Sequence, residues 1–180
     1  MKGIVFTEFL DFVEDSFGYE LVDELVTSLD LPSGGSYTSV GSYEFTELVQ
    51  LLTKTCELTK IEPKEALRLF GWHLFEVFTK SYSHFFHDVH SSFQIFSSLD
   101  NKIHPEVLKL YPDAELPKFE IEKHESNELV MIYRSSRRMA DFAIGLIEAC
   151  LDHFNEKGEI SLENLDPNGE AVRFRISKSS

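Results

Sequence analysis

The spacing of apolar residues changes about two-thirds of the way along this 180-residue chain, and this change constrains the fold most. Up to about residue 99, apolar side chains recur every three or four positions, which is typical of amphipathic helices. After residue 118 they alternate with polar residues in separate short runs, which is typical of half-buried strands. Helices first and an antiparallel sheet of about four strands later predict an α+β fold.

The same patterns place the individual elements. Helical spacing predicts helices over residues 4–13, 21–26, 44–59, 63–80, 83–99 and 139–155. Gly18 is a typical helix stop, Pro63 suits a first helical turn, and Gly158 is expected to close the last helix. Alternation predicts strands over residues 119–121, 129–133 and 171–176, the first two forming a hairpin. We expect a single domain over residues 1–180.

Charge and cysteine content exclude several classes of protein. Lys and Arg total 17 against 31 Asp and Glu, and a net charge of −14 argues against binding to nucleic acid or to an anionic membrane. No apolar run reaches the roughly 20 residues of a transmembrane helix, and Glu8 and Asp11 interrupt any export signal. We therefore expect a cytoplasmic protein. Cys56 and Cys150 form neither a CxxC pair nor a CxxCH haem attachment, so we expect no Cys-rich zinc site.

A histidine cluster offers one candidate metal site. His84, His87 and His90 are spaced three apart, with Asp88 among them. One helix can present two of these side chains on a common face but not all three, so a polar helix face is the favoured interpretation. A non-haem metal enzyme stays as an alternative. No hydrolase or nucleotide-binding motif is present, and we predict a protein that is not an enzyme.

Two further motifs carry more specific chemistry. His104 follows an apolar helical segment and precedes Pro105. Tyr133, Ser135 and Arg137 are spaced two apart, and on a strand they would project from one face. Two hydroxyl groups and a guanidinium together suit a carboxylate pair or a phosphate.

In this order and spacing, the two motifs resemble those of the H-NOX family, the haem nitric oxide/oxygen-binding domains related to the sensor domain of soluble guanylate cyclase. The resemblance covers essentially the whole chain. Other segments also match the family: Met1-Lys2-Gly3, Phe70-Gly71, Leu99-Asp100, Tyr111-Pro112, Pro117 and the segment from Asp141 to Glu148.

The resemblance implies a non-covalent haem b between the helical part and the sheet. It implies that His104 is the proximal ligand of the haem iron and that Tyr133, Ser135 and Arg137 bind the propionates. Pro117 corresponds to a proline that presses on the porphyrin. Because proline disfavours a helical conformation in the residue before it, we expect His104 at a kink or a first turn.

The resemblance also bears on which gas binds. In oxygen-binding members a distal tyrosine donates a hydrogen bond, and its position here is Phe142, which has no hydroxyl group. Phe9 and Leu74 are also apolar and, with Val5 and Leu146, complete an expected dry distal pocket. We therefore expect nitric oxide, and also carbon monoxide, as ligands. A dioxygen-binding haem sensor is the alternative.

The expected mechanism follows from the same resemblance. Nitric oxide weakens the bond between iron and His104, and the segment that carries His104 then shifts. We expect no output domain after the last predicted strand. The expected partner is a separate histidine kinase or a cyclic-di-GMP cyclase or phosphodiesterase.

Overall fold

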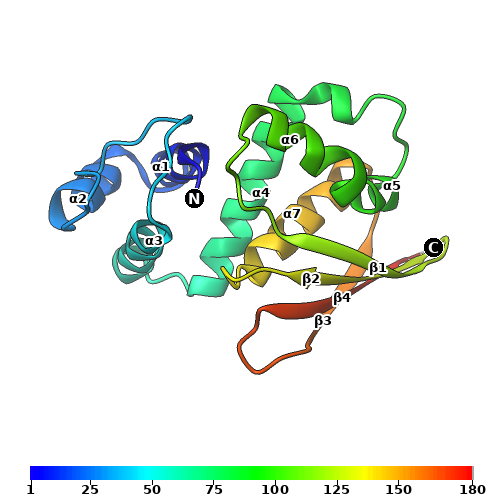
Figure 1. Cartoon of the computed structure of the whole chain (residues 1–180). Helices are drawn as coiled ribbons and strands as arrows, with labels where there is room; N and C mark the ends of the chain where they lie inside the picture. The colour runs from blue at the N-terminus through cyan, green and yellow to red at the C-terminus, as the bar shows by residue number, and fades with distance from the viewer. Residues whose placement is uncertain (180) are drawn as a thin grey trace. The chain divides into compact units, whose positions relative to one another are not determined.

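The computed structural model describes residues 1–179 and confirms the α+β fold, with helices mostly first and a four-stranded antiparallel sheet last (Figure 1). The α-helices are α1 Gly3–Phe17, α2 Tyr19–Ser28, α3 Phe45–Thr59, α4 Pro63–Ser81, α5 Ser92–Ser97, α6 His104–Leu110 and α7 Ala140–His153. A 3₁₀ helix, η1, covers Ser83–Phe85, and a π-helix, η2, covers Leu99–Ile103. The strands are β1 Lys118–His124, β2 Glu128–Arg134, β3 Gly158–Asn164 and β4 Ala171–Lys178.

Two of the predicted helix boundaries are confirmed. Gly18 ends α1 with a φ of 91°, a conformation that glycine adopts without strain, and Pro63 opens α4. No helix within residues 1–179 has both the length and the apolar character needed to cross a membrane.

The single helix predicted over residues 83–99 is wrong. The chain forms η1, then turns through Asp88, whose φ is 61°, before α5 begins at Ser92. The Ser91 hydroxyl caps α5 by accepting a hydrogen bond from the Gln94 N–H, and such a cap favours a new helix start at this point. Helical spacing of the aromatic residues concealed this break.

The role predicted for Gly158 is also wrong. Helix α7 already ends at His153, and Gly158 is the first residue of β3. Strand β3 lies at the edge of the sheet, where nearly all of its residues are exposed. Strand β3 is absent from the predicted strand ranges. An exposed edge strand needs few apolar residues, so its alternating pattern is weak.

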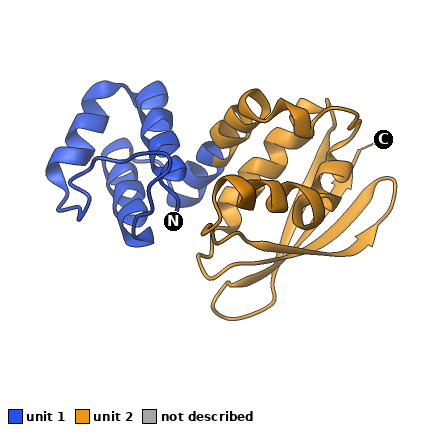
Figure 2. Ribbon diagram, turned by 45° about the horizontal axis from the view of Figure 1, so that its top comes forward, with its two compact units in different colours: residues 1–70 blue, residues 71–180 orange. Residues whose placement is uncertain are grey.

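The chain divides into two compact units, residues 1–70 and residues 71–180, whose boundary falls within α4 (Figure 2). Phenylalanine dominates the core of the first unit. Phe9 packs edge to face on Phe70, with ring centroids 5.1 Å apart, and also contacts Phe12. All three rings are at most 4% exposed. Aromatic burial of this kind supplies much of the apolar area that stabilises a small unit.

A buried carboxylate organises the loop between α2 and α3. Glu47 is 2% exposed, and it accepts hydrogen bonds from the Ser33 hydroxyl at 2.5 Å and the Tyr37 hydroxyl at 3.0 Å. Burial is the main reason that the pKa of Tyr37 is raised to about 12, which keeps its hydroxyl protonated as a donor. The carboxylate therefore fixes the loop on α3.

The second unit is built on the sheet, whose strand order is β1-β2-β4-β3 with every neighbouring pair antiparallel. One face of β2 and β4 packs with residues of α4, α5 and α7 in a single apolar core. From the strands this core takes Leu129, Met131, Tyr133, Val172, Phe174 and Ile176. On the other face Arg173 bridges Glu122 and Glu163, at 2.6 Å and 2.7 Å. The sheet therefore has one apolar and one charged face.

A polar cluster fixes α5, the helix that leads into η2 and His104. Glu156 accepts a hydrogen bond from the Ser92 hydroxyl at 2.5 Å and pairs with the Lys178 ammonium at 2.6 Å. The Lys178 ammonium also lies 3.8 Å from the centre of the Phe93 ring. The start of α5 is thereby tied to the end of β4.

Helices α4 and α7 approach closely at Gly71. A Cβ atom added to Gly71 would lie 2.3 Å from the Phe142 carbonyl oxygen and 3.1 Å from the Gly145 Cα. Both neighbours are main-chain atoms of α7, so they cannot move without shifting the helix. A side chain at position 71 would therefore require a shift of α7.

We expect a Gly71→Ala variant to lower the free energy of unfolding by about 1–3 kcal/mol, because overpacking outweighs the better helix propensity of alanine. Urea denaturation measures the change. A Ser28→Ala variant at the exposed end of α2 is the control, and it should stay within about 0.5 kcal/mol of the parent protein. Equal stability of the Gly71→Ala variant and the parent would contradict the close packing.

Candidate functional site

His104 lies at a change of helix type. It is the first residue of α6 and directly follows the π-helix η2, with its N–H donating to the Leu99 carbonyl. With Pro105 beside it, His104 lies in the first turn of α6, as expected. His104 itself is nevertheless helical, with φ −60° and ψ −40°. The steric bias of proline against this conformation is thus overcome where the wider π turn passes into the α-helix.

Asp100 orients the imidazole ring. The Nδ1 atom of His104 lies 2.9 Å from Asp100 Oδ1, and Asp100 Oδ2 accepts a hydrogen bond from the Phe119 N–H at 2.8 Å. Because an ionised carboxylate only accepts, Nδ1 carries the proton and Nε2 presents its lone pair. Within residues 1–179 no group hydrogen-bonds to Nε2. A carboxylate behind the second ring nitrogen is the usual support of a metal-binding histidine.

Burial favours the neutral form of the imidazole. Its side chain is 16% exposed, and burial lowers the pKa of His104, while the Asp100 carboxylate opposes part of that shift. A neutral imidazole is the form that binds a metal ion.

Sequence analysis did not identify Asp100 as a site residue. The Asp-x-x-x-His spacing, which puts the two side chains on one helix face, was the available local signal.

Tyr133, Ser135 and Arg137 do not share one strand face, contrary to the prediction. Only Tyr133 lies in β2, which ends at Arg134, whereas Ser135 and Arg137 belong to the turn that follows. Within this turn the Ser135 hydroxyl accepts from the Arg137 N–H at 3.2 Å. The turn therefore brings the serine and the arginine to the end of the strand by local hydrogen bonding rather than by strand alternation.

The Tyr133 hydroxyl is buried and remains protonated. It accepts a hydrogen bond from the Met139 N–H at 3.3 Å, and its residue is 3% exposed. Burial raises the pKa of Tyr133, although the Ser135 hydroxyl, the Met139 N–H and the Arg137 charge oppose the shift. The strand end thus offers a phenolic donor beside a serine hydroxyl and a guanidinium.

Arg137 has a protein partner that sequence analysis missed. Its Nη1 and Nη2 atoms donate to the main-chain oxygen and to a carboxylate oxygen of Glu115, both at 2.7 Å. Glu115 lies in the connection between α6 and β1, and Pro117 lies half-buried at the end of the same connection. No local pattern in the sequence signals this contact, because 22 residues separate the two partners.

Phe119 joins the two motifs. Its ring centroid lies 6.0 Å from that of His104 and 5.5 Å from that of Tyr133. The structure therefore brings the histidine and the tyrosine to the same aromatic residue of β1, although they are 29 positions apart in sequence (133 − 104 = 29).

The five predicted distal residues fall into two sets. Val5 and Phe9 lie on α1 in the first unit, where Phe9 belongs to the phenylalanine core. Leu74 lies on α4 in the second unit, and Phe142 and Leu146 lie on α7, which meets α4 at Gly71. None of the five side chains carries a hydrogen-bond donor.

The alternative site at His84 and His87 lacks the geometry of a metal centre. His84 lies in the short helix η1, whereas His87 and Asp88 lie in the turn after it. The described part of the chain, residues 1–179, contains no group of three or more His, Cys, Asp or Glu side chains placed to hold a metal ion.

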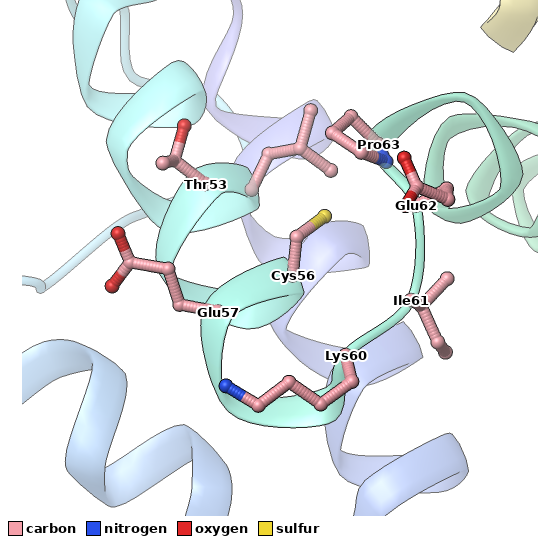
Figure 3. A pocket seen from close by; sticks show the side chains of 8 residues that line it. Thr53, Cys56, Glu57, Lys60, Ile61, Glu62 and Pro63 are labelled. Atoms are coloured by element: carbon pink, nitrogen blue, oxygen red, sulfur yellow. The ribbon is translucent and has the colours of Figure 1, made fainter.

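A hollow of about 390 Å³ occurs on the first unit, between the end of α3 and the start of α4 (Figure 3). None of the predicted site residues lines it. Its lining consists of Leu52, Thr53, Cys56, Glu57, Lys60, Ile61, Glu62 and Pro63. Burial and the nearby Glu62 charge raise the pKa of the Cys56 thiol, so this cysteine is not an activated nucleophile.

Comparison with known families decides the family of this chain. The profile of the haem-NO-binding (HNOB) family matches residues 2–162. The chain belongs to the H-NOX family. A search of curated proteins found none that matches.

Solved H-NOX structures agree with this membership. The unliganded Fe(II) H-NOX protein from K. algicida is 44% identical over 100% of this chain and 97% of its own, with a TM-score of 0.94. The H-NOX protein from Shewanella woodyi, solved in the Fe(II)CO state, is 40% identical over 99% and 95%, with a TM-score of 0.85. An H-NOX protein from S. oneidensis in the Fe(II)NO state shares the fold at 24% identity, covering 100% of both chains with a TM-score of 0.90.

H-NOX domains are haem-binding gas sensors, and the residues of this H-NOX chain fit a haem group. A neutral imidazole backed by Asp100 suits ferrous iron. A buried tyrosine hydroxyl, a serine hydroxyl and the Arg137 guanidinium suit a pair of propionates.

Proposed function

We propose that this H-NOX domain is a nitric oxide sensor that holds non-covalent haem b, with His104 as the proximal ligand. The observation that carries the proposal is the His104 imidazole, which Asp100 orients so that Nε2 is presented as a ligand atom. Ferrous haem held at this site would supply the iron that binds a diatomic gas, and the bond from His104 Nε2 to that iron would be the one that nitric oxide weakens.

Tyr133, Ser135 and Arg137 are the proposed propionate ligands. A propionate is an anion that must leave water, so it needs donors that are themselves held in place. The Ser135–Arg137 hydrogen bond and the contact of Arg137 with the Glu115 main-chain oxygen hold these donors at the end of β2. Pro117, directly before β1, is the proposed porphyrin contact.

An Asp100→Asn variant should retain haem about ten- to a hundred-fold less tightly, as is typical when a residue behind a metal ligand is changed. Asparagine has one acceptor oxygen, whereas Asp100 uses two for His104 Nδ1 and the Phe119 N–H. The rate of haem transfer to an excess of a haem-scavenging protein measures the effect. An Asp15→Asn variant on the exposed end of α1 is the control. Equal transfer rates for both variants would contradict the role of Asp100.

The proposed distal residues favour nitric oxide over dioxygen. Dioxygen is stabilised strongly by a hydrogen-bond donor, and nitric oxide needs one much less. Val5, Phe9, Leu74, Phe142 and Leu146 supply none. Carbon monoxide, which also needs no donor, is a further expected ligand.

Exposure of the reduced protein to air separates this proposal from its alternative, a dioxygen sensor. We expect oxidation to the ferric state without a long-lived oxygen complex. A stable oxygen-complex spectrum in air would support the dioxygen sensor and contradict the assignment to nitric oxide.

We propose that η2 and α6, the segment that carries His104, shift when the ligand binds. No residue of η2 or α6 is buried, whereas α5 just before them is anchored through Ser92. His104 and the start of β1 share Asp100 as an acceptor, so a displacement of the imidazole also changes the hydrogen bond to Phe119. A weakly attached helix with a shared hydrogen bond is a two-state element that a ligand can bias.

The proposed output is control of a separate protein, a histidine kinase or a cyclic-di-GMP cyclase or phosphodiesterase, by a domain without catalytic activity of its own. We further propose that residues 1–180 act as one domain in this sensing. Activity of such a partner, measured with the ferrous protein in the presence and absence of nitric oxide, tests this output. A partner whose activity is the same in both states would contradict it.

A further inference from the structure

The Glu115 side chain binds the Arg137 guanidinium, which the proposed function assigns to a haem propionate. Arg137 Nη1 donates to the Glu115 main-chain oxygen and Nη2 donates to its carboxylate, both at 2.7 Å. A glutamate side chain ends in the same chemical group as a propionate. One arginine therefore has two carboxylates as candidates for the same hydrogen bonds.

The two partners of this ion pair differ in their exposure. The Arg137 side chain is 16% exposed, whereas that of Glu115 is 78% exposed. A mostly buried guanidinium needs an anion, because leaving its charge without a partner in the protein is costly. The exposed carboxylate, by contrast, regains water when it is released. The pair is thus arranged so that Glu115 can be exchanged for another anion at little cost.

The main-chain contact makes the exchange partial. The hydrogen bond from Nη1 to the Glu115 carbonyl oxygen does not depend on the glutamate side chain. The connection between α6 and β1 therefore stays attached to Arg137 when the carboxylate leaves. The side chain alone is the exchangeable part.

We infer that the Glu115 carboxylate competes with a haem propionate for Arg137. Glu115 pairs with Arg137 and yields it to a propionate when haem binds, so that Glu115 sets how tightly the propionate is held. This inference rests on the proposed function, since it takes Arg137 as a propionate ligand.

A Glu115→Gln variant tests the inference, because glutamine keeps the size of the side chain and the main-chain contact but removes the charge. Haem loss from the ferric holoprotein to an excess of a haem-scavenging protein should slow by roughly two- to five-fold, the range expected for an exposed ion pair. The matched control is Glu170→Gln, which removes a 46% exposed carboxylate from the neighbouring Arg138. Its rate of haem loss should equal that of the parent protein.

A double variant identifies the arginine through which Glu115 acts. In an Arg137→Leu background, Glu115→Gln should leave the rate of haem loss unchanged. An equal slowing in both backgrounds would overturn the inference, because the effect would then be one of general charge.

The remaining outcomes are also decisive. Faster haem loss from the Glu115→Gln variant would overturn the inference and show that Glu115 positions Arg137 for the propionate. If the parent and the variant both bind haem and lose it at the same rate, the inference is overturned but the proposed function is not. A parent protein that takes up no haem would overturn the proposed function as well.

Discussion

A His104→Gly variant should hold at most about a tenth of the haem retained by the parent protein, since the iron loses its protein ligand and even a change behind a metal ligand costs ten- to a hundred-fold. Glycine also removes the imidazole from the start of α6 and leaves room for a small molecule. Imidazole added to the medium should therefore restore much of the haem content. Haem stoichiometry of the purified protein, with and without imidazole, measures both effects.

The control for this variant is a histidine outside the site. His124 lies at the end of β1, where its Nδ1 is 3.1 Å from the Ser97 hydroxyl. A His124→Gly variant removes the same side chain with its hydrogen bond and should keep its haem. A His104→Gly variant with the haem content and the carbon monoxide spectrum of the parent would contradict the assignment of the proximal ligand.

An Arg137→Leu variant should lose haem roughly ten- to a hundred-fold faster than the parent, because one charge-assisted hydrogen bond contributes about 1.5–3 kcal/mol. Leucine is apolar and cannot donate to a propionate. The rate of transfer to a haem-scavenging protein is again the measurement. The effect should persist in high salt, since Arg137 is 16% exposed and a mostly buried pair is poorly screened.

The adjacent arginine provides the control for Arg137. Arg138 belongs to the same turn, is 55% exposed and pairs with Glu170 at 3.0 Å. An Arg138→Leu variant should lose haem at the parent rate. Equal acceleration in the two variants would show that the turn, rather than the Arg137 guanidinium, retains the haem.

The sequence predicted the elements that have strong periodicity or clear end signals. Helix α1 with its Gly18 stop, helix α4 with Pro63, and the hairpin of β1 and β2 belong to this group. The chain between residues 83 and 99 was predicted wrongly because its aromatic residues keep a helical spacing across a break. Burial of Phe85 in η1 and the Ser91 cap decided the structure there.

The candidate site could be predicted only in part, for a similar reason. His104, Tyr133, Ser135 and Arg137 were found because they form ordered motifs in the sequence. Of their supporting groups, Glu115 on the arginine is defined by folding, whereas Asp100 also had a local signal in its spacing of four from His104. Asp100 reaches the Phe119 N–H across 19 positions, and such contacts leave no periodic signal in a single sequence.

The turn after β2 shows the same limit on a smaller scale. Alternation predicted that Ser135 and Arg137 continue the face of Tyr133, yet the strand ends at Arg134. The turn is closed by the Ser135–Arg137 hydrogen bond and by Arg138, whose φ is 55°. Local side-chain bonding of serine overrode the strand period at this point.

The central claim is that His104 holds a haem iron and releases it when nitric oxide binds. The most direct test follows the reduced protein, produced with ample haem, by absorption and electron paramagnetic resonance before and after addition of nitric oxide. The account predicts a haem absorption band at the start and, afterwards, a signal with hyperfine coupling to the nitrogen of nitric oxide alone. A colourless protein, or a second nitrogen coupling from a retained histidine, would contradict it.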